Sequence, residues 1–175
     1  MKNALRYYLC LWILICYASC AKVDQFFTFT ITNESTIRIP ATGPIDSAFA
    51  ISSPDITTNS SEAFANNNTD AGHVKNIHLK SMELNITSPP GQTFDFLKSV
   101  HVYISTNSSN EIQLAYLDSI PQGVDSIALI PTQSALDQYV KAPSYNLRAE
   151  AVLRQGLTQD VNVDINSKFS VTANL

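Results

Sequence analysis

The sequence predicts an all-β protein, an antiparallel β-sandwich of immunoglobulin-like or jelly-roll style with one or two very short helices. Through most of the chain after residue 25, apolar residues alternate with polar ones, which is the period of a half-buried strand. Turn signals rich in Pro, Gly, Asn and Ser recur at short spacing, as in sandwiches. A closed antiparallel barrel is the alternative architecture.

The first twenty residues differ from the rest. Residues 1–8 carry two basic side chains and no acid, and residues 9–16 are eight uninterrupted apolar residues. The small residues Ala18 and Ser19 follow. A basic start, a short apolar run and a small-residue exit predict a secretory signal peptide over residues 1–19. The apolar run is too short for a transmembrane helix, which needs about 20 apolar residues.

The stretch Tyr17-Ala18-Ser19-Cys20 resembles the lipobox of bacterial lipoproteins, although Tyr17 stands where that family usually has Leu or another aliphatic residue. The resemblance implies that signal peptidase II cuts before Cys20, that its thiol carries a diacylglycerol, and that its amino group takes a third acyl chain. Residues 20–25 would then be the lipidated N-terminus and a short tether. Two alternatives remain: signal peptidase I could cut after Ala21, or Cys20 could simply belong to the apolar run.

Cysteine use and charge narrow the setting further. All three cysteines lie in the first twenty residues, so the mature chain has no disulfide, which favours a bacterial protein. Beyond residue 20, nine scattered basic residues face fifteen acidic ones, a net charge of −6 that argues against a nucleic-acid partner. With Ala21 after the cysteine, the sequence resembles lipoproteins that are sorted to the outer membrane. Its richness in Asn, Ser and Thr resembles the lipoproteins of Bacteroidota-type bacteria.

Residues 26–175 are expected to form one domain. Phe27, Phe29 and Ile31 alternate with threonines and predict a strand over residues 27–32, with a short strand before Pro40. Residues 41–72 are expected to be a long irregular loop, because they are dense in Asn, Ser, Thr and Pro.

Two very short helices are expected. Asn59, followed three residues later by Glu62, has the pattern of a capping box, so the first helix is expected over residues 60–66. The second is expected over residues 135–140 and ends before Pro143.

The clearest strands lie in the second half. In residues 73–86 the apolar parity changes at Lys80-Ser81, which predicts a β-bulge or a bend there. Further strands are expected over residues 94–104, 112–117, 125–130, 145–153 and 161–173. In the expected strand over residues 94–104, every second residue from Phe94 is apolar except Lys98. The Gln155-Gly156 turn is expected to join the last two as a hairpin.

The sequence contains none of the common catalytic motifs. The chain has no G-x-S-x-G, H-E-x-x-H, P-loop or dinucleotide motif, so we expect no enzyme and no cofactor. Asp160 to Asp164 imitates part of a calcium loop without its Gly and Glu, so no metal site is expected. His101 and Tyr103 share an outward strand face and form a possible binding face. The alternative is an ordinary surface ladder of cross-strand pairs.

These patterns predict a lipid-anchored protein of the bacterial cell envelope, at the outer membrane and facing the periplasm or the surface. Its expected role is a non-enzymatic structural or protein-interaction module, with the membrane as one partner through Cys20 and other envelope proteins or glycans as further partners. A glycan-binding or small-ligand-binding sandwich is the second hypothesis. A hydrolase that uses paired carboxylates is the third.

Overall fold

A computed structural model describes residues 26–174 of the chain. The predicted signal peptide and the lipobox around Cys20 lie outside the described residues. The elements in chain order are β1 (Phe26–Ile39), β2 (Ala48–Ser52), β3 (Ile56–Thr57), α2 (Ser60–Asn66), β4 (Val74–Ser88), the 3-10 turn η1 (Phe94–Phe96), β5 (Leu97–Ser105), β6 (Ile112–Leu117), β7 (Ser126–Pro131), α3 (Asp137–Val140), β8 (Ser144–Leu153) and β9 (Val161–Asn174).

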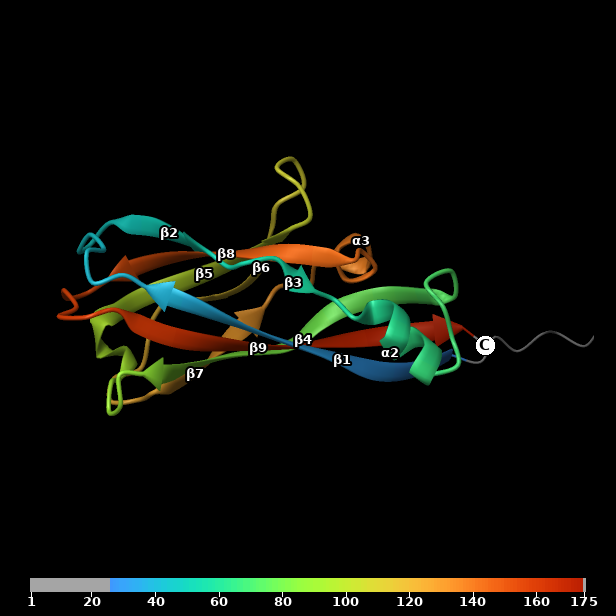
Figure 1. The fold of residues 1–175 in the computed structure, drawn as a ribbon, viewed down its shortest axis with the longest axis horizontal. Helices are drawn as coiled ribbons and strands as arrows, with labels where there is room; N and C mark the ends of the chain where they lie inside the picture. The colour runs from blue at the N-terminus through green and yellow to red at the C-terminus, as the bar shows by residue number, and fades with distance from the viewer. Residues whose placement is uncertain (1–25, 175) are drawn as a thin grey trace, which may run out of the picture.

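The strands form two antiparallel layers, which confirms the predicted β-sandwich (Figure 1). One layer has the order β1-β9-β4-β7, and the other has the order β6-β5-β8-β2, with β3 also paired to β8. Within residues 26–174 the layers are continuous only where β6 meets β7, at Ala115 opposite Pro131 and Tyr116 opposite Ile130. On the other side, β1 lies at the edge of one layer, and β2 and β3 lie at the edge of the other.

The core lies between the two layers and follows directly from the period-two pattern. Along β9, every second residue from Val161 to Ala173 is buried, and the residues between them are mostly half-buried. The ring of Phe169 is fully buried and meets the ring of Tyr145, on the opposite layer, at 6.1 Å edge to face. Alternation therefore sends one side of each strand into a shared apolar interior.

β1 is one strand of 14 residues, not two short ones. It pairs with β9 without interruption from Phe26 opposite Asn174 to Ile39 opposite Val161. The polar residue Asn33 does not break the strand, because its side chain faces inward and donates to the carbonyl oxygen of Thr57 at 3.0 Å. The strand ends before Pro40, as expected.

The expectation of an irregular loop over residues 41–72 is wrong. β2 within it pairs with β8, and its Phe49 and Ile51 pack against the core. Strand β3 then extends the same layer. The strands are short and rich in small polar neighbours, so the alternation in the sequence is weak.

Helix α2 has the predicted bounds, but the predicted cap is wrong. Asn59 takes a left-handed conformation (φ 50°) and its side chain makes no capping hydrogen bond. Instead, the hydroxyl of Thr58 accepts a long bond from the backbone N–H of Ser60 at 3.4 Å. Helix α3 is shorter than predicted. The N–H of Leu136, just before it, bonds instead to the carbonyl oxygen of Ile77, which ties this segment to β4.

Two irregularities explain the parity changes in the sequence. The register of β4 against β9 shifts between Leu79 and Ser81, which confirms the predicted bulge. A second shift lies in β5, between Leu97 and Ser99, in its register against β8. Because of this shift, Lys98 faces solvent while the apolar residues before and after it are buried. The residues before this shift form η1 instead of a strand.

The predicted hairpin of the last two strands is wrong. β8 lies between β5 and β2 in one layer, whereas β9 lies between β1 and β4 in the other. The Gln155-Gly156 region therefore crosses from one layer to the other. Both chain ends of the described part, Phe26 and Asn174, lie side by side at the end of the sandwich that carries α2 (Figure 1).

Candidate functional site

The first candidate is the outer face of β5, where the sequence placed His101 and Tyr103. Both side chains are half-buried and alternate with the buried residues Val100, Val102 and Ile104, so they do share an outward face. Opposite them on β8 lie Glu150 and Arg148, respectively. This surface is therefore a row of cross-strand polar and aromatic pairs.

Each of the two residues is engaged by a charged partner. His101 Nε2 lies 2.8 Å from Asp118 Oδ1, and its ring lies 6.0 Å from the ring of Tyr116. The guanidinium of Arg148 lies 4.3 Å from the centre of the Tyr103 ring, within the range of a cation–π contact. The sequence predicted the two residues but not these partners, because their closeness depends on strand pairing.

Arg148 holds this cluster together. Its Nε and Nη2 donate to the two carboxylate oxygens of Glu111 at 2.9 and 2.8 Å, and Nη1 donates to Glu150 at 3.1 Å. The bond from Arg148 lowers the pKa of the Glu111 carboxyl, and the same bond raises the pKa of Arg148. Arg148 lies over the Tyr103 ring, so that ring is not an open stacking platform on this side. Binding at His101 and Tyr103 stays a prediction.

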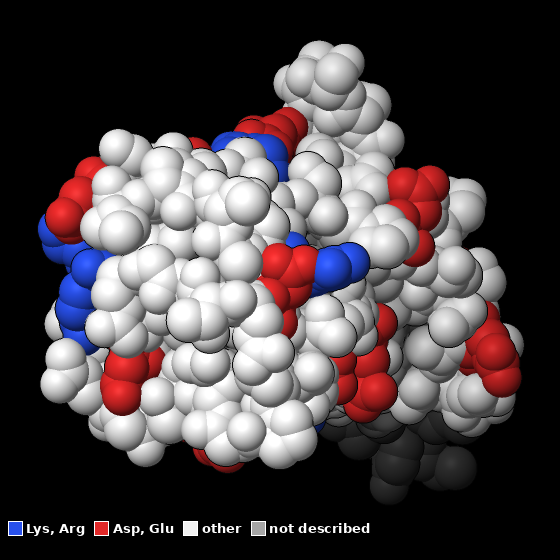
Figure 2. All heavy atoms as spheres, turned by 60° about the vertical axis from the view of Figure 1, so that its left-hand side comes forward, with Lys and Arg blue, Asp and Glu red and all other residues white. Residues whose placement is uncertain are grey.

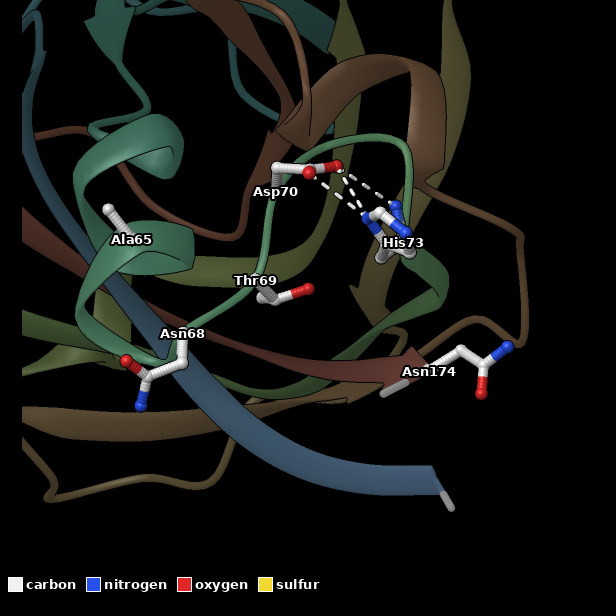
Figure 3. A pocket seen from close by; sticks show the side chains of 6 residues that line it. All are labelled: Ala65, Asn68, Thr69, Asp70, His73 and Asn174. Atoms are coloured by element: carbon white, nitrogen blue, oxygen red, sulfur yellow. Dashed lines mark hydrogen bonds and ion pairs between the residues drawn. The ribbon is translucent and has the colours of Figure 1, made fainter. Parts of the chain in front are cut away.

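The second candidate is a cavity of about 360 Å³ beside α2 (Figure 3). Its lining comes from the last turn of α2, the segment that follows it and the end of β9: Ala65, Asn68, Thr69, Asp70, His73 and Asn174. Asp70 and His73 point toward each other, with His73 Nδ1 3.0 Å from Asp70 Oδ2. This bond and one from the Gly72 N–H at 2.7 Å lower the pKa of Asp70.

Two polar atoms in this cavity lack partners. Thr69 Oγ1 and Asn174 Oδ1 are both buried, and neither has a hydrogen bond within residues 26–174. Because both atoms are closed off by their neighbours, a ligand hydroxyl group can donate to them only after a surrounding side chain moves. No local sequence pattern predicts this cavity, because Asn174 reaches it only through the pairing of the chain ends.

Three observations among the described residues bear on catalytic chemistry. His73 is held by Asp70, and the Thr69 hydroxyl makes no bond to that imidazole. No group of three or more potential metal ligands occurs within residues 26–174. Two carboxylates, those of Glu34 and Asp55, line the same cavity of about 430 Å³.

Charge is spread in small patches. On the face drawn in Figure 2, acidic and basic groups stand close together or singly on a mostly uncharged surface. Several opposite charges are paired, such as Arg38 with Asp160 and Lys98 with Asp46. No helix among the described residues is long and apolar enough to cross a bilayer.

Comparison with known proteins finds no matching family model and no matching curated protein. Among solved structures, the chain is similar to the BFDV capsid protein from a decameric assembly, with 11% identity, 85% of this chain and 99% of that chain covered, and a TM-score of 0.41. It is also similar to FLHE, with 10% identity, coverage of 85% and 98%, and a TM-score of 0.32. Desmodium yellow mottle tymovirus gives 11% identity, coverage of 85% and 90%, and a TM-score of 0.29. At these identities the likeness concerns the fold alone.

Proposed function

We propose that this protein is a lipoprotein of the bacterial cell envelope, anchored through Cys20, whose β-sandwich acts as a non-enzymatic interaction or structural module. The observation that carries the proposal is the stretch Tyr17-Ala18-Ser19-Cys20 at the end of a short apolar run. Two or three acyl chains hold a protein firmly at a membrane, whereas one chain binds only marginally.

The arrangement of the domain agrees with such an anchor. β1 begins at Phe26, and only five residues separate it from Cys20, so the tether spans at most about 20 Å when fully extended. The end of the sandwich with α2 would then lie close to the membrane. The loops at the opposite end, including the crossing at Gln155-Gly156, would face away and meet partners.

The anchor is tested by labelling cells with radioactive palmitate and separating membranes from soluble proteins. We expect the wild-type chain to be labelled and to sediment with membranes, and the Cys20→Ala variant to lose both properties. Cys16→Ala and Cys10→Ala are the matched controls and should keep the label if they are exported. A Cys20→Ala protein that stays labelled in the membrane fraction would contradict the proposal.

A second candidate function, binding of a glycan or small polar ligand, is supported by the cavity beside α2. Its two unpartnered buried oxygens, Thr69 Oγ1 and Asn174 Oδ1, can accept hydrogen bonds from ligand hydroxyl groups once a neighbouring side chain moves aside. A panel of sugars in a thermal-shift assay tests this function. A sugar that raises the melting temperature of the wild type but not of Thr69→Val supports it, and a panel without effect counts against it.

A further inference from the structure

The open side of the sandwich carries an unpaired strand edge. Within the described residues, β1 pairs with β9 along its whole length and with no strand on its other side. A strand edge of this kind presents a row of backbone N–H and C=O groups that can pair with another chain. Natural edges are usually blunted by shortness, by lysine or by a covering segment, but β1 is 14 residues long and contains no lysine.

A groove runs along this edge. Two cavities, of about 200 and 430 Å³, lie between β1 and residues 54–66, a segment that includes α2. Residues of β1 from Thr30 to Thr36 form one wall, and Asn59 on the opposite wall lines both cavities. Each cavity therefore borders three residues of β1, residues 30–32 for one and residues 34–36 for the other, and the buried Asn33 lies between them.

Asn33 joins the two walls at the point between the two cavities. This residue lies between the parts of β1 that line the two cavities and is 7% exposed. Its Nδ2 donates to the carbonyl oxygens of Thr57 at 3.0 Å and Thr58 at 3.3 Å. Its Oδ1 is buried and has no hydrogen-bond partner in residues 26–174.

The charged side chains that line the groove are all acidic. Glu34 lies on the β1 wall, and Asp55 and Glu62 lie on the opposite wall. All three are exposed, and none forms an ion pair within the described part of the chain. No lysine or arginine lines either cavity. Opposite charges across strands stabilise pairing and like charges oppose it, so the groove favours a cationic occupant.

We infer that this groove accepts an extended, lysine- or arginine-bearing polypeptide segment, which adds to β1 as an extra strand. Backbone hydrogen bonds to the free edge supply the attachment, and cationic side chains beside Glu34, Asp55 and Glu62 supply the selectivity. The inference deepens the proposed role as an interaction module, since it names the surface and the chemistry of the partner. It does not depend on the lipid at Cys20.

The test uses the full chain, purified in detergent from membranes, and three fluorescent nonapeptides with blocked ends. The first alternates lysine with valine, the second replaces every lysine by glutamate, and the third is the lysine peptide with alternate backbone nitrogens methylated. Fluorescence anisotropy should show that the lysine peptide binds at least about tenfold more tightly than either of the others. Equal binding of the methylated peptide would overturn strand addition, and no binding of the lysine peptide at millimolar concentration would overturn the inference.

Variants place the binding on this surface. Glu34→Lys/Asp55→Lys should lose the lysine peptide and prefer the glutamate peptide, and the neutral variant Glu34→Gln/Asp55→Asn should weaken binding without reversing it. Glu83→Lys/Asp125→Lys reverses two charges outside the groove and is the matched control, with unchanged binding expected. Variants with the wild-type melting temperature are compared, and wild-type affinity in Glu34→Lys/Asp55→Lys would contradict the inference.

Hydrogen exchange locates the added strand independently. The lysine peptide should slow exchange in residues 26–39 and leave β7, in the same layer, unchanged. Sedimentation of the free protein tests the other occupant, a second copy of this chain. A dimer that blocks peptide binding and disappears in Glu34→Lys/Asp55→Lys would overturn the assignment to a basic segment. A protein that binds the peptide but carries no lipid contradicts only the anchor, and a lipidated protein that does not bind contradicts only this inference.

Discussion

Asn33 and Thr57 join the two layers of the sandwich on its open side: the side-chain amide of Asn33 donates to the carbonyl oxygen of Thr57 at 3.0 Å. On the opposite side the layers are continuous through β6 and β7. A buried polar contact between two strands that do not pair therefore keeps the edge of β1 beside β3. The same contact joins the two walls of the groove described above.

Replacing Asn33 with Ala should lower the free energy of unfolding by about 1–2 kcal/mol, because the carbonyl oxygens of Thr57 and Thr58 lose their donor. Urea unfolding measures the change. Asn66→Ala, at an exposed position of α2, is the control and should stay within about 0.5 kcal/mol. Equal stability of the two variants would show that the Asn33 contact does not hold the layers together.

Two buried tyrosines should respond oppositely to the loss of their hydroxyl groups. Tyr145 OH is buried with no hydrogen-bond partner in residues 26–174, and burial raises the pKa of this phenol. Tyr139 OH donates to the carbonyl oxygen of Asn110 at 2.7 Å. Tyr139→Phe should therefore cost about 1 kcal/mol in urea unfolding, while Tyr145→Phe should be neutral or stabilising. A larger loss for Tyr145→Phe would contradict the assignment.

Acid should weaken the fold partly through Glu111. Its folded pKa lies below the ordinary value of 4.5 because Arg148 donates to it, so its contribution to stability is present above pH 4.5 and is lost as the pH falls through the lower folded pKa. Unfolding free energies at about pH 6 and about pH 3 should differ less in Glu111→Gln than in the wild type. Glu83→Gln, without an ion pair in the described residues, is the control. Identical pH dependence in all three proteins would contradict the prediction.

Gly123 should tolerate alanine poorly although space is available. Its φ of 73° lies in the left-handed region, and no described atom lies within 4 Å of an added Cβ. Gly123→Ala should cost about 1 kcal/mol through backbone strain alone. Gly156→Ala, where the Cβ would meet only Ile45 at 3.7 Å, should stay within about 0.5 kcal/mol. Thermal unfolding of the two variants measures the cost of backbone strain at Gly123 against a position without that strain.

Strand positions were predictable because alternation is a local property. The parity of residues such as Val161 and Phe169 states which face of the sheet a side chain occupies, and the structure agrees. Parity does not state which strand is the partner. The segment at Gln155-Gly156 has the composition of a hairpin turn, yet it crosses between layers, because β8 and β9 bury their apolar faces against each other from opposite sides of the core.

The candidate sites were predictable only in part for the same reason. Alternation placed His101 and Tyr103 outward, but their contacts with Asp118 and Arg148 come from residues 17 and 45 positions away in the chain. The groove along β1 was hidden further, because the sequence suggested a break near Asn33. The free edge of a strand depends on the topology of the whole sheet, which no local pattern carries.

The state of Cys20 tests the central claim most directly. Mass spectrometry of the mature protein extracted from membranes should find a chain that begins at Cys20 and carries two or three acyl chains. A mature chain without lipid that begins at Lys22, after a cut behind Ala21, would contradict the account of a lipid-anchored envelope protein.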